Sequence, residues 1–235
     1  MKRRKFIIQS SLGMLATIPS IDLSAILDVP YFTTGIKIGE ITSTSAIVWT
    51  RLTKREVRIK DKGILPVILY WDDVENEWHN EDYFAKKYNM GRPDKKVKVI
   101  MPENHIVETL DGAVPGIEGQ IKIKYRPHGT NVWKTTPWKK VDTDTDYTCP
   151  FSLKNLMENT RYDILVLGKT FNKGINTIEG SFTTAPPKDL SAPIHFMVTT
   201  CHEYTHQDIP ENGGFRIFHE MKKLKPNFLV HTGDI

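Results

Sequence analysis

The sequence predicts a mainly β protein that changes to α/β near its carboxyl end: an antiparallel β-sandwich followed by one β-α-β unit. Three observations predict this fold class. Short runs rich in β-branched and aromatic residues recur between residues 33 and 184, with turn residues between them. A proline-punctuated linker follows at 186–193. After it come an apolar run, an amphipathic stretch and a second apolar run. With 235 residues, 39% of them apolar, the chain can bury a real core.

Residues 1–25 are typical of a twin-arginine export signal, with Arg3-Arg4 near the start and small residues at the end. Four basic residues against the single acid Asp22 give this segment a net charge of +3, which leaves +1 for residues 26–235. The basic composition therefore indicates no nucleic-acid-binding module. The apolar stretch is too short and broken for a stable membrane span, which needs about 20 apolar residues. We expect export to the periplasm or the cell surface, with the twin-arginine translocation machinery as a partner. A short amphipathic helix or a membrane anchor is the alternative.

The sandwich is expected over residues 31–185. A run at 156–162 resembles the tyrosine corner of fibronectin type III and immunoglobulin (Ig)-like domains, in which the hydroxyl of Tyr162 would tie down the chain entering a strand. Glu158 stands where a proline is usual. We interpret Tyr162 and Trp49 as packing residues of the sandwich rather than as ligand contacts. Strands are expected at 35–40 and 46–52, which flank a polar turn, and at 120–125, 132–141, 147–153, 161–170 and 177–184.

An insertion at about 53–119 interrupts the sandwich and is too long to be a structureless loop. We expect extra strands at 64–71 and 97–101, and a polar excursion at 72–82. Its aromatic residues could contact a substrate, but a local core is the favoured interpretation. These residues are Tyr70, Trp71, Trp78, Tyr83 and Tyr88.

The two cysteines, Cys149 and Cys201, could pair in an oxidising compartment. Cys149, however, lies in an alternating run in which Tyr147, Cys149 and Phe151 share one face. This pattern favours a small core residue at position 149.

The carboxyl-terminal segment 194–235 carries the residues with metal-binding chemistry. An apolar run at 194–200 predicts a strand that ends at Cys201, and a second run at 228–230 leads to Asp234. Neighbouring parallel strands lie about 4.8 Å apart, and ligands of such sheets bind at the carboxyl ends of the strands. A thiolate and a carboxylate could therefore converge on one ion. Between the strands we expect a helix whose apolar face holds Ile217, Phe218, Met221 and Leu224.

Gly233-Asp234 at the end of a second parallel strand resembles the metallophosphoesterase pattern. Cys201 at the end of the first strand narrows the resemblance to the PhoD-type alkaline phosphatases, whose strands end in Ser-Cys-Gln and His-x-Gly-Asp-Tyr. This chain departs from that pattern at His202, in place of glutamine, and at Ile235, in place of tyrosine. Other segments similar to the family are the leader, Trp49-Thr50-Arg51 and the boundary Phe182-Thr183-Thr184-Ala185-Pro186.

The resemblance implies metal-dependent hydrolysis of phosphate mono- or diesters. Cys201 would bind a ferric iron as thiolate, and Asp234 would bridge that iron to calcium ions. His202, Glu203 and His206 are candidates for groups that support the ligands or contact the substrate, with solvated loop residues as the alternative. The family's remaining ligands would lie beyond residue 235. We therefore expect 194–235 to be a truncated start of the catalytic domain and the chain to be an inactive fragment.

Two alternatives from other functional classes remain open. The first is an exported Ig-like binding or adhesion module without catalysis. The second is a thiol enzyme that uses Cys201 with His202 or His206 as base. Adjacent residues at a strand end point apart, which disfavours His202 in that role.

Overall fold

The computed structural model describes residues 29–60, 64–89, 94, 96–170, 174–202, 207–209 and 214–233. The expected export signal at 1–25 lies outside these residues. The chain divides into two compact units, Met1–Thr184 and Ala185–Ile235. Among the described residues, no helix is long and apolar enough to cross a membrane.

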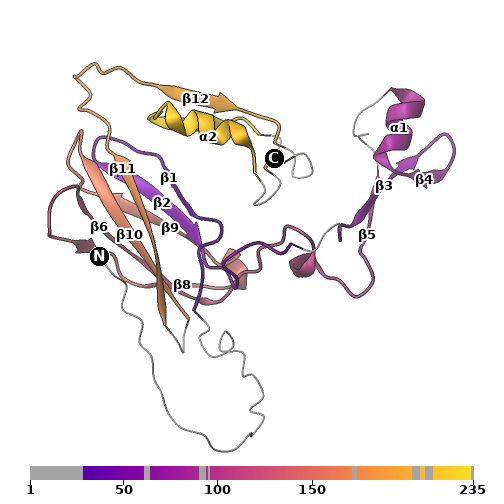
Figure 1. Ribbon diagram of the computed structural model, residues 1–235, viewed down its shortest axis with the longest axis horizontal. Helices are drawn as coiled ribbons and strands as arrows, with labels where there is room; N and C mark the ends of the chain where they lie inside the picture. Colours follow the sequence, from indigo (N-terminus) through magenta and orange to yellow (C-terminus); the bar gives the residue numbers. More distant parts are fainter. Residues whose placement is uncertain are drawn as a thin grey trace, which may run out of the picture. The chain divides into compact units, whose positions relative to one another are not determined.

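The first unit contains the predicted β-sandwich, whose strands can be followed in Figure 1. One antiparallel sheet has the order β1-β2-β9, formed by β1 (Ile36–Gly39), β2 (Ser45–Arg51) and β9 (Thr148–Lys154). The other has the order β11-β10-β6-β7, formed by β11 (Ile175–Thr183), β10 (Arg161–Lys169), β6 (Gly119–Pro127) and β7 (Lys134–Thr135), with β8 (Lys139–Val141) also pairing with β6. Two short 3-10 helices lie at Val107–Thr109 and Thr143–Thr145.

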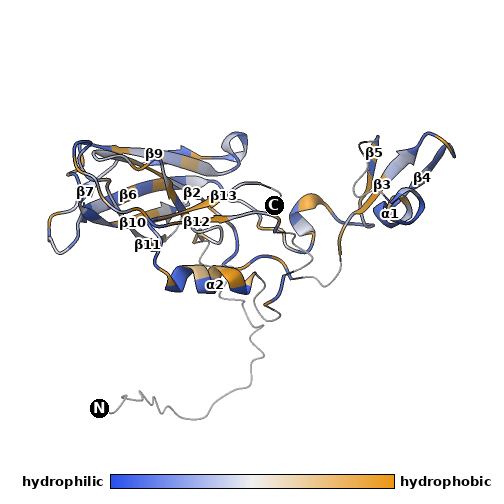
Figure 2. Ribbon diagram, turned by 90° about the horizontal axis from the view of Figure 1, so that it is seen from above, coloured by the Kyte–Doolittle hydropathy of each residue, from blue (hydrophilic) through white to orange (hydrophobic). Residues whose placement is uncertain are grey.

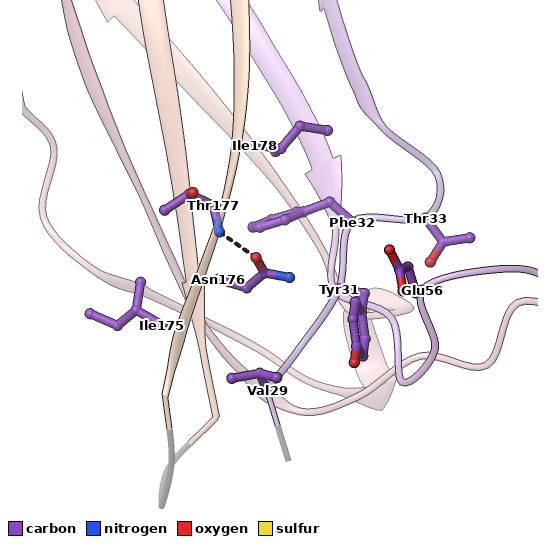
Figure 3. A pocket seen from close by; sticks show the side chains of 9 residues that line it. All are labelled: Val29, Tyr31, Phe32, Thr33, Glu56, Ile175, Asn176, Thr177 and Ile178. Atoms are coloured by element: carbon purple, nitrogen blue, oxygen red, sulfur yellow. Dashed lines mark hydrogen bonds between the residues drawn. The ribbon is translucent and has the colours of Figure 1, made fainter. Parts of the chain in front are cut away.

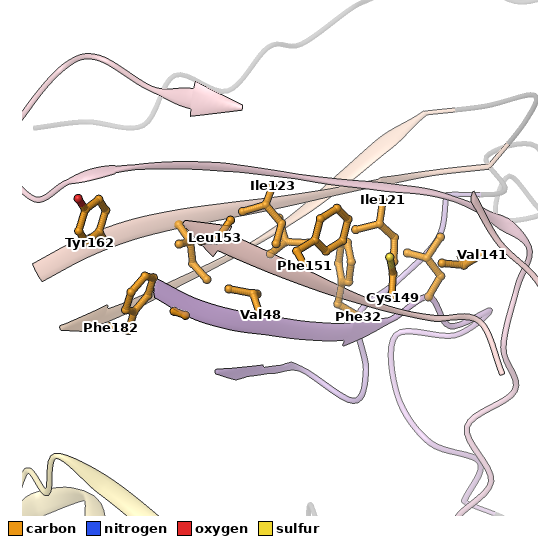
Figure 4. Close-up of a cluster of buried hydrophobic side chains, with 14 of the residues drawn as sticks. Phe32, Val48, Ile121, Ile123, Val141, Cys149, Phe151, Leu153, Tyr162 and Phe182 are labelled. Carbon is orange, nitrogen blue, oxygen red and sulfur yellow. The ribbon is translucent and has the colours of Figure 1, made fainter. Parts of the chain in front are cut away.

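The core of the sandwich forms because alternate residues of both sheets point inward. In β10 every second residue from Tyr162 to Val166 is buried, while the residues between them are only partly covered. Fully burying one such apolar side chain contributes about 1.5–3 kcal/mol, which makes this cluster the main source of the unit's stability. The buried residues drawn in Figure 4 include Phe32, Val48, Ile121, Ile123, Val141, Phe151, Leu153 and Phe182.

The sequence patterns located the sandwich strands to within a few residues, with two corrections. The stretch expected as one strand at 132–141 is two short strands, because Pro137 has no N–H to offer the ladder. Trp49 does not point into the core: it is half-buried on the other face of β2, where the Lys37 ammonium lies 5.2 Å from the ring centroid. The prediction of a core position for Cys149 is confirmed, since it is 6% exposed and both cysteines are free.

The side chains of Tyr162 and Arg51 bind loops of the sandwich to its strands. The Tyr162 hydroxyl accepts a hydrogen bond from the Met157 backbone N–H at 2.9 Å, and its ring stacks on Phe182, so the tyrosine corner is present despite Glu158. Arg51 at the end of β2 donates to the Val114 carbonyl oxygen at 2.6 Å. Its other nitrogens donate to the backbone and side chain of Asp146.

The insertion folds on its own small core, as expected from its aromatic residues. Tyr70 and Phe84 are buried and meet edge to face, with ring centroids 6.3 Å apart. The polar excursion expected at 72–82 instead holds a strand and the start of a helix. Asn80 caps that helix by accepting a hydrogen bond from the Tyr83 N–H. The elements are β3 (Val67–Asp72), β4 (Glu77–His79), α1 (Glu81–Tyr88) and β5 (Val97–Ile100), with the sheet order β4-β3-β5.

The second unit is the predicted β-α-β unit, made of β12 (Phe196–Thr199), α2 (Arg216–Lys223) and β13 (Phe228–His231). The two strands are parallel. Figure 2 shows polar and apolar residues alternating around α2. Of the four residues expected on its covered face, Phe218 and Met221 are partly buried, while Ile217 and Leu224 are exposed. A two-stranded sheet is too narrow to cover the whole apolar stripe.

Candidate functional site

The structure brings the two strand ends of the β-α-β unit together. The Thr232 N–H donates to the Thr199 carbonyl oxygen at 2.9 Å, which continues the parallel pairing beyond β13. The Cys201 N–H then donates to the Gly233 carbonyl oxygen at 3.4 Å. Cys201 is therefore hydrogen-bonded to the residue that directly precedes Asp234. Asp234 itself, like the other predicted residues Glu203 and His206, lies outside the described residues.

Both strand ends turn sharply in the left-handed region of backbone conformation. Cys201 has φ of 57° and Gly233 has φ of 110°. Glycine adopts this conformation without strain, whereas it costs free energy at a residue with a side chain, such as Cys201. The Cys201 side chain is exposed, and its Sγ lies 3.6 Å from the Thr200 Oγ1. The thiol is thus accessible to an ion from solvent.

Behind Cys201, two histidines link the strand ends. The His231 Nδ1 accepts from the Gly233 N–H at 3.2 Å, so its Nε2 carries the proton in the neutral ring. That Nε2 lies 2.7 Å from the His202 Nδ1, which accepts a hydrogen bond from it. The His202 Nε2 in turn donates to the Thr199 Oγ1 at 3.3 Å. The backbone contact of Gly233 therefore sets the tautomer of both rings.

His202 is not a solvated loop residue. Its ring lies between the strand ends and helix α2, with centroids 4.7 Å from those of Phe215 and Phe218. Both of its nitrogens have partners other than the Cys201 thiol, so the described residues offer that thiol no histidine base. The thiol-enzyme alternative gains no support from this arrangement. The contact between His202 and His231 was not predicted from the sequence, because it depends on the register that places Thr199 opposite His231 across the parallel strands.

A second cluster with metal-ligating side chains lies in the insertion. One ligand atom each from Asp72, Glu75 and His79 lies within 4.8 Å of the others. The buried Asp72 carboxylate, however, already accepts hydrogen bonds from the Val74 and Glu75 amides and from the Tyr83 and Tyr88 hydroxyls. We interpret this carboxylate as the structural centre of the insertion.

Hydrogen bonds and burial shift the pKa values of the ionisable groups in this cluster. Burial raises the pKa of Asp72, but its hydrogen bonds outweigh that effect, so the pKa lies below the usual 3.8. Glu75 binds Lys87 and Tyr83, and these bonds lower the pKa of its carboxyl group. Burial, together with the bond to Glu75, raises the pKa of Tyr83 to about 12. Lys87 thus balances the charge of Glu75, and amide and phenol donors already occupy the Asp72 carboxylate.

Two pockets can be described in the first unit. One, of about 540 Å³, lies beside β11. In Figure 3 its Asn176 accepts a hydrogen bond from the adjacent Thr177 N–H. The Asn176 amide also donates to the Pro30 carbonyl oxygen at 3.0 Å, which joins β11 to the chain before β1. Among the described residues that line this pocket, the only acid is Glu56. The other, of about 400 Å³, lies on the β6-β10-β11 sheet and includes Arg126, Trp133 and Asp163. Neither contains a cysteine or a histidine.

Comparison with known proteins supports the fold. No family model matches the chain, and no curated protein matches it. Among solved structures, the chain is similar to PhoD at 15% identity, with a TM-score of 0.50; the match covers 86% of this chain and 27% of the PhoD chain. The chain thus spans about a quarter of the PhoD chain. Since Met1–Thr184 makes up less than 86% of the residues, the match reaches into the β-α-β unit.

Fibronectin type III domains are also similar to the chain, at TM-scores too low to support an argument. The domain from the human KIAA0970 protein has 11% identity and a TM-score of 0.29, over 78% of this chain and 98% of that one. A two-domain segment of chicken tenascin has 12% identity and a TM-score of 0.24, over 66% of this chain and 99% of that one. The likeness to PhoD, at its low identity, shows the fold alone: a mainly β protein with a sandwich.

Proposed function

We propose that the β-α-β unit is the start of a metal-dependent phosphoesterase domain of PhoD type, in which Cys201 and Asp234 are metal ligands. The domain would hydrolyse phosphate mono- or diesters. The single observation that carries the proposal is the hydrogen bond from Cys201 to Gly233, which brings the thiol-bearing turn beside the residue preceding Asp234. The likeness in fold to PhoD supports it.

The described donor fits the metals that the resemblance implies. The Cys201 thiol is exposed, and its polar neighbour is the Thr200 hydroxyl at 3.6 Å, so none of the residues that the structure describes blocks it from binding an ion as thiolate. A thiolate suits ferric iron, and carboxylate oxygens suit iron and calcium. Such ions, when bound, supply Lewis acidity at the phosphate group. The chain's own part is to hold Cys201 and Asp234 at neighbouring strand ends.

The open face of the small sheet supports a place for this unit within a larger α/β domain. Phe196 and Phe228 stack in register with centroids 5.4 Å apart, and both are about half exposed, as is Val198. Parallel sheets are normally covered on both faces. Two ligands on one open sheet also give an incomplete site, so we propose that these 235 residues alone turn over no phosphate ester.

We also propose that the protein is exported through the twin-arginine pathway to the periplasm or cell surface. The sequence of residues 1–25 supports this. A fusion of these residues to a reporter that is active only after folded export tests it. Replacement of Arg3 and Arg4 by lysine is expected to abolish export, and continued export of that variant would contradict the proposal.

Titration with ferric iron tests the assignment of ligands. A thiolate bound to ferric iron gives a visible charge-transfer absorption, so we expect the 235-residue chain to show this band. Cys201→Ser is expected to lose the band, and Asp234→Asn to bind iron at least tenfold more weakly. Asp189→Asn, at an exposed position of the linker, is the matched control and should titrate like the wild type. Equal iron binding by wild type and Cys201→Ser would overturn the assignment.

The second candidate function is an exported Ig-like binding module without catalysis. The outer face of the β6-β10 sheet favours it, because Lys122 and Lys169 lie over Trp138 at 4.6 and 4.5 Å, and Arg126 lies over Trp133 at 4.4 Å. Under this alternative, iron titration finds no thiolate band. Trp133→Ala and Trp138→Ala would then weaken retention of the chain on the cell surface.

A further inference from the structure

Among the polar contacts that join the two strand ends within the described part of the β-α-β unit, the contact between the histidines is the shortest. The His202–His231 distance is 2.7 Å. The Thr232 amide contact is 2.9 Å, and the Thr200 hydroxyl and Cys201 amide reach the Gly233 oxygen at 3.2 and 3.4 Å. Hydrogen bonds weaken as the distance grows beyond about 3 Å. The histidine pair is therefore a principal link at the point where the backbone hydrogen bonds between the two strands become long.

The turn at Cys201 needs such a link. Its left-handed backbone carries a conformational cost that a glycine would avoid, and its own amide contact is long. His202 follows Cys201 directly, while His231 precedes Gly233 by two residues. A bond between the two rings therefore restrains both turns at once.

From this geometry we propose that His202 and His231 are positioning residues of the metal centre. Their hydrogen bond holds the turn that presents Cys201 against the turn that leads to Asp234. The pair does not touch the metal. This role rests on the proposed function, because it concerns the same two ligands. The aromatic rings of Phe215 and Phe218 fix the plane of His202 from the side of α2.

Packing and positioning can be separated by the choice of substitution. Leucine at position 202 keeps the contact with Phe215 and Phe218 but offers no polar atom. Glutamine at the same position has an amide with both a donor and an acceptor, as the neutral imidazole has. His219 on α2 is exposed and lies outside the pair, so His219→Leu is the matched control.

The experiment measures the affinity of the full 235-residue chain for ferric iron by the thiolate band, with the metal alone as probe. Residues that orient metal ligands typically cost 10–100-fold in affinity when they are replaced. We expect His202→Leu and His231→Leu each to weaken iron binding at least tenfold. The double variant should be no weaker than either single variant, because both break one bond. His202→Gln should recover affinity to within about threefold of the wild type, and His219→Leu should match it.

A second readout needs no metal. Hydrogen exchange of the Thr232 amide, which donates to Thr199, reports whether the strand ends remain joined. We expect faster exchange in His202→Leu than in His202→Gln. If Cys201→Ser loses the band while His202→Leu keeps wild-type affinity and exchange, the positioning role is refuted and the proposed function stands. If Cys201→Ser binds iron like the wild type, the proposed function fails, and the positioning role falls with it.

Discussion

Replacing Tyr162 by phenylalanine removes one hydroxyl group from the sandwich and leaves the ring in place. The ring is 2% exposed and stacks on Phe182, so its packing should survive. The Met157 N–H then loses its acceptor. A buried donor left without a partner costs about 1–3 kcal/mol. Because the Met157 side chain is 52% exposed, water can reach this loop, and we expect the lower part of that range, about 1–2 kcal/mol.

Thermal unfolding measures this effect. For a unit of this size, 1 kcal/mol shifts the Tm by about 2–4 °C, so the Tm of Tyr162→Phe should fall by about 2–8 °C. Tyr125→Phe is the matched control: its ring centroid lies 6.4 Å from that of Tyr162, and its hydroxyl makes no hydrogen bond within the described part of the chain. A Tyr162→Phe variant that unfolds at the same temperature as the control would refute the stabilising role of the tyrosine corner.

Two further perturbations test other parts of the first unit. The lowered pKa of Asp72 means that its ionised form stabilises the insertion fully above the unfolded value of 3.8, and that this stability is lost as the pH falls through the folded value. Acid titration followed by the NMR ring signals of Phe84 should show this loss. Asp72→Asn should remove the part of the pH dependence that comes from Asp72 and leave the part that comes from Glu75, whose pKa is also lowered. Gly119→Ala would place a Cβ against the Lys169 carbonyl oxygen and 2.9 Å from Leu52, so chemical denaturation should show a loss of about 1–3 kcal/mol; an unchanged midpoint would contradict this close packing.

The sandwich could be predicted because its strands alternate cleanly. In β10 the buried positions 162, 164 and 166 carry an aromatic and two β-branched residues. Because every second residue is apolar, the pattern predicts which face of the strand is buried. Helix α1 was missed because its eight residues contain few apolar side chains: only Phe84 is buried, and charged residues fill most other positions. Its signal was the cap, since Asn80 precedes two acids.

The candidate site was predictable only at the level of chain order. The sequence places Cys201 after one strand and Asp234 after the next, and parallel pairing brings such positions to one edge. The direction of the His202 side chain depends on the left-handed turn at Cys201. The periodicity of a sequence does not predict such a turn at a residue other than glycine. Its contact with His231 therefore emerges only from three-dimensional geometry.

The half-covered sheet of the β-α-β unit affects how the chain behaves during synthesis. Translation delivers the sandwich first, and its core can close as soon as β11 has emerged from the ribosome. The strands that follow present Phe196, Val198 and Phe228 to the cytosol, where neighbouring nascent chains can adhere to them. A cell that overproduces this polypeptide should therefore form inclusions through its last fifty residues. Slower translation or a bound chaperone would act on that segment, while the sandwich would need neither.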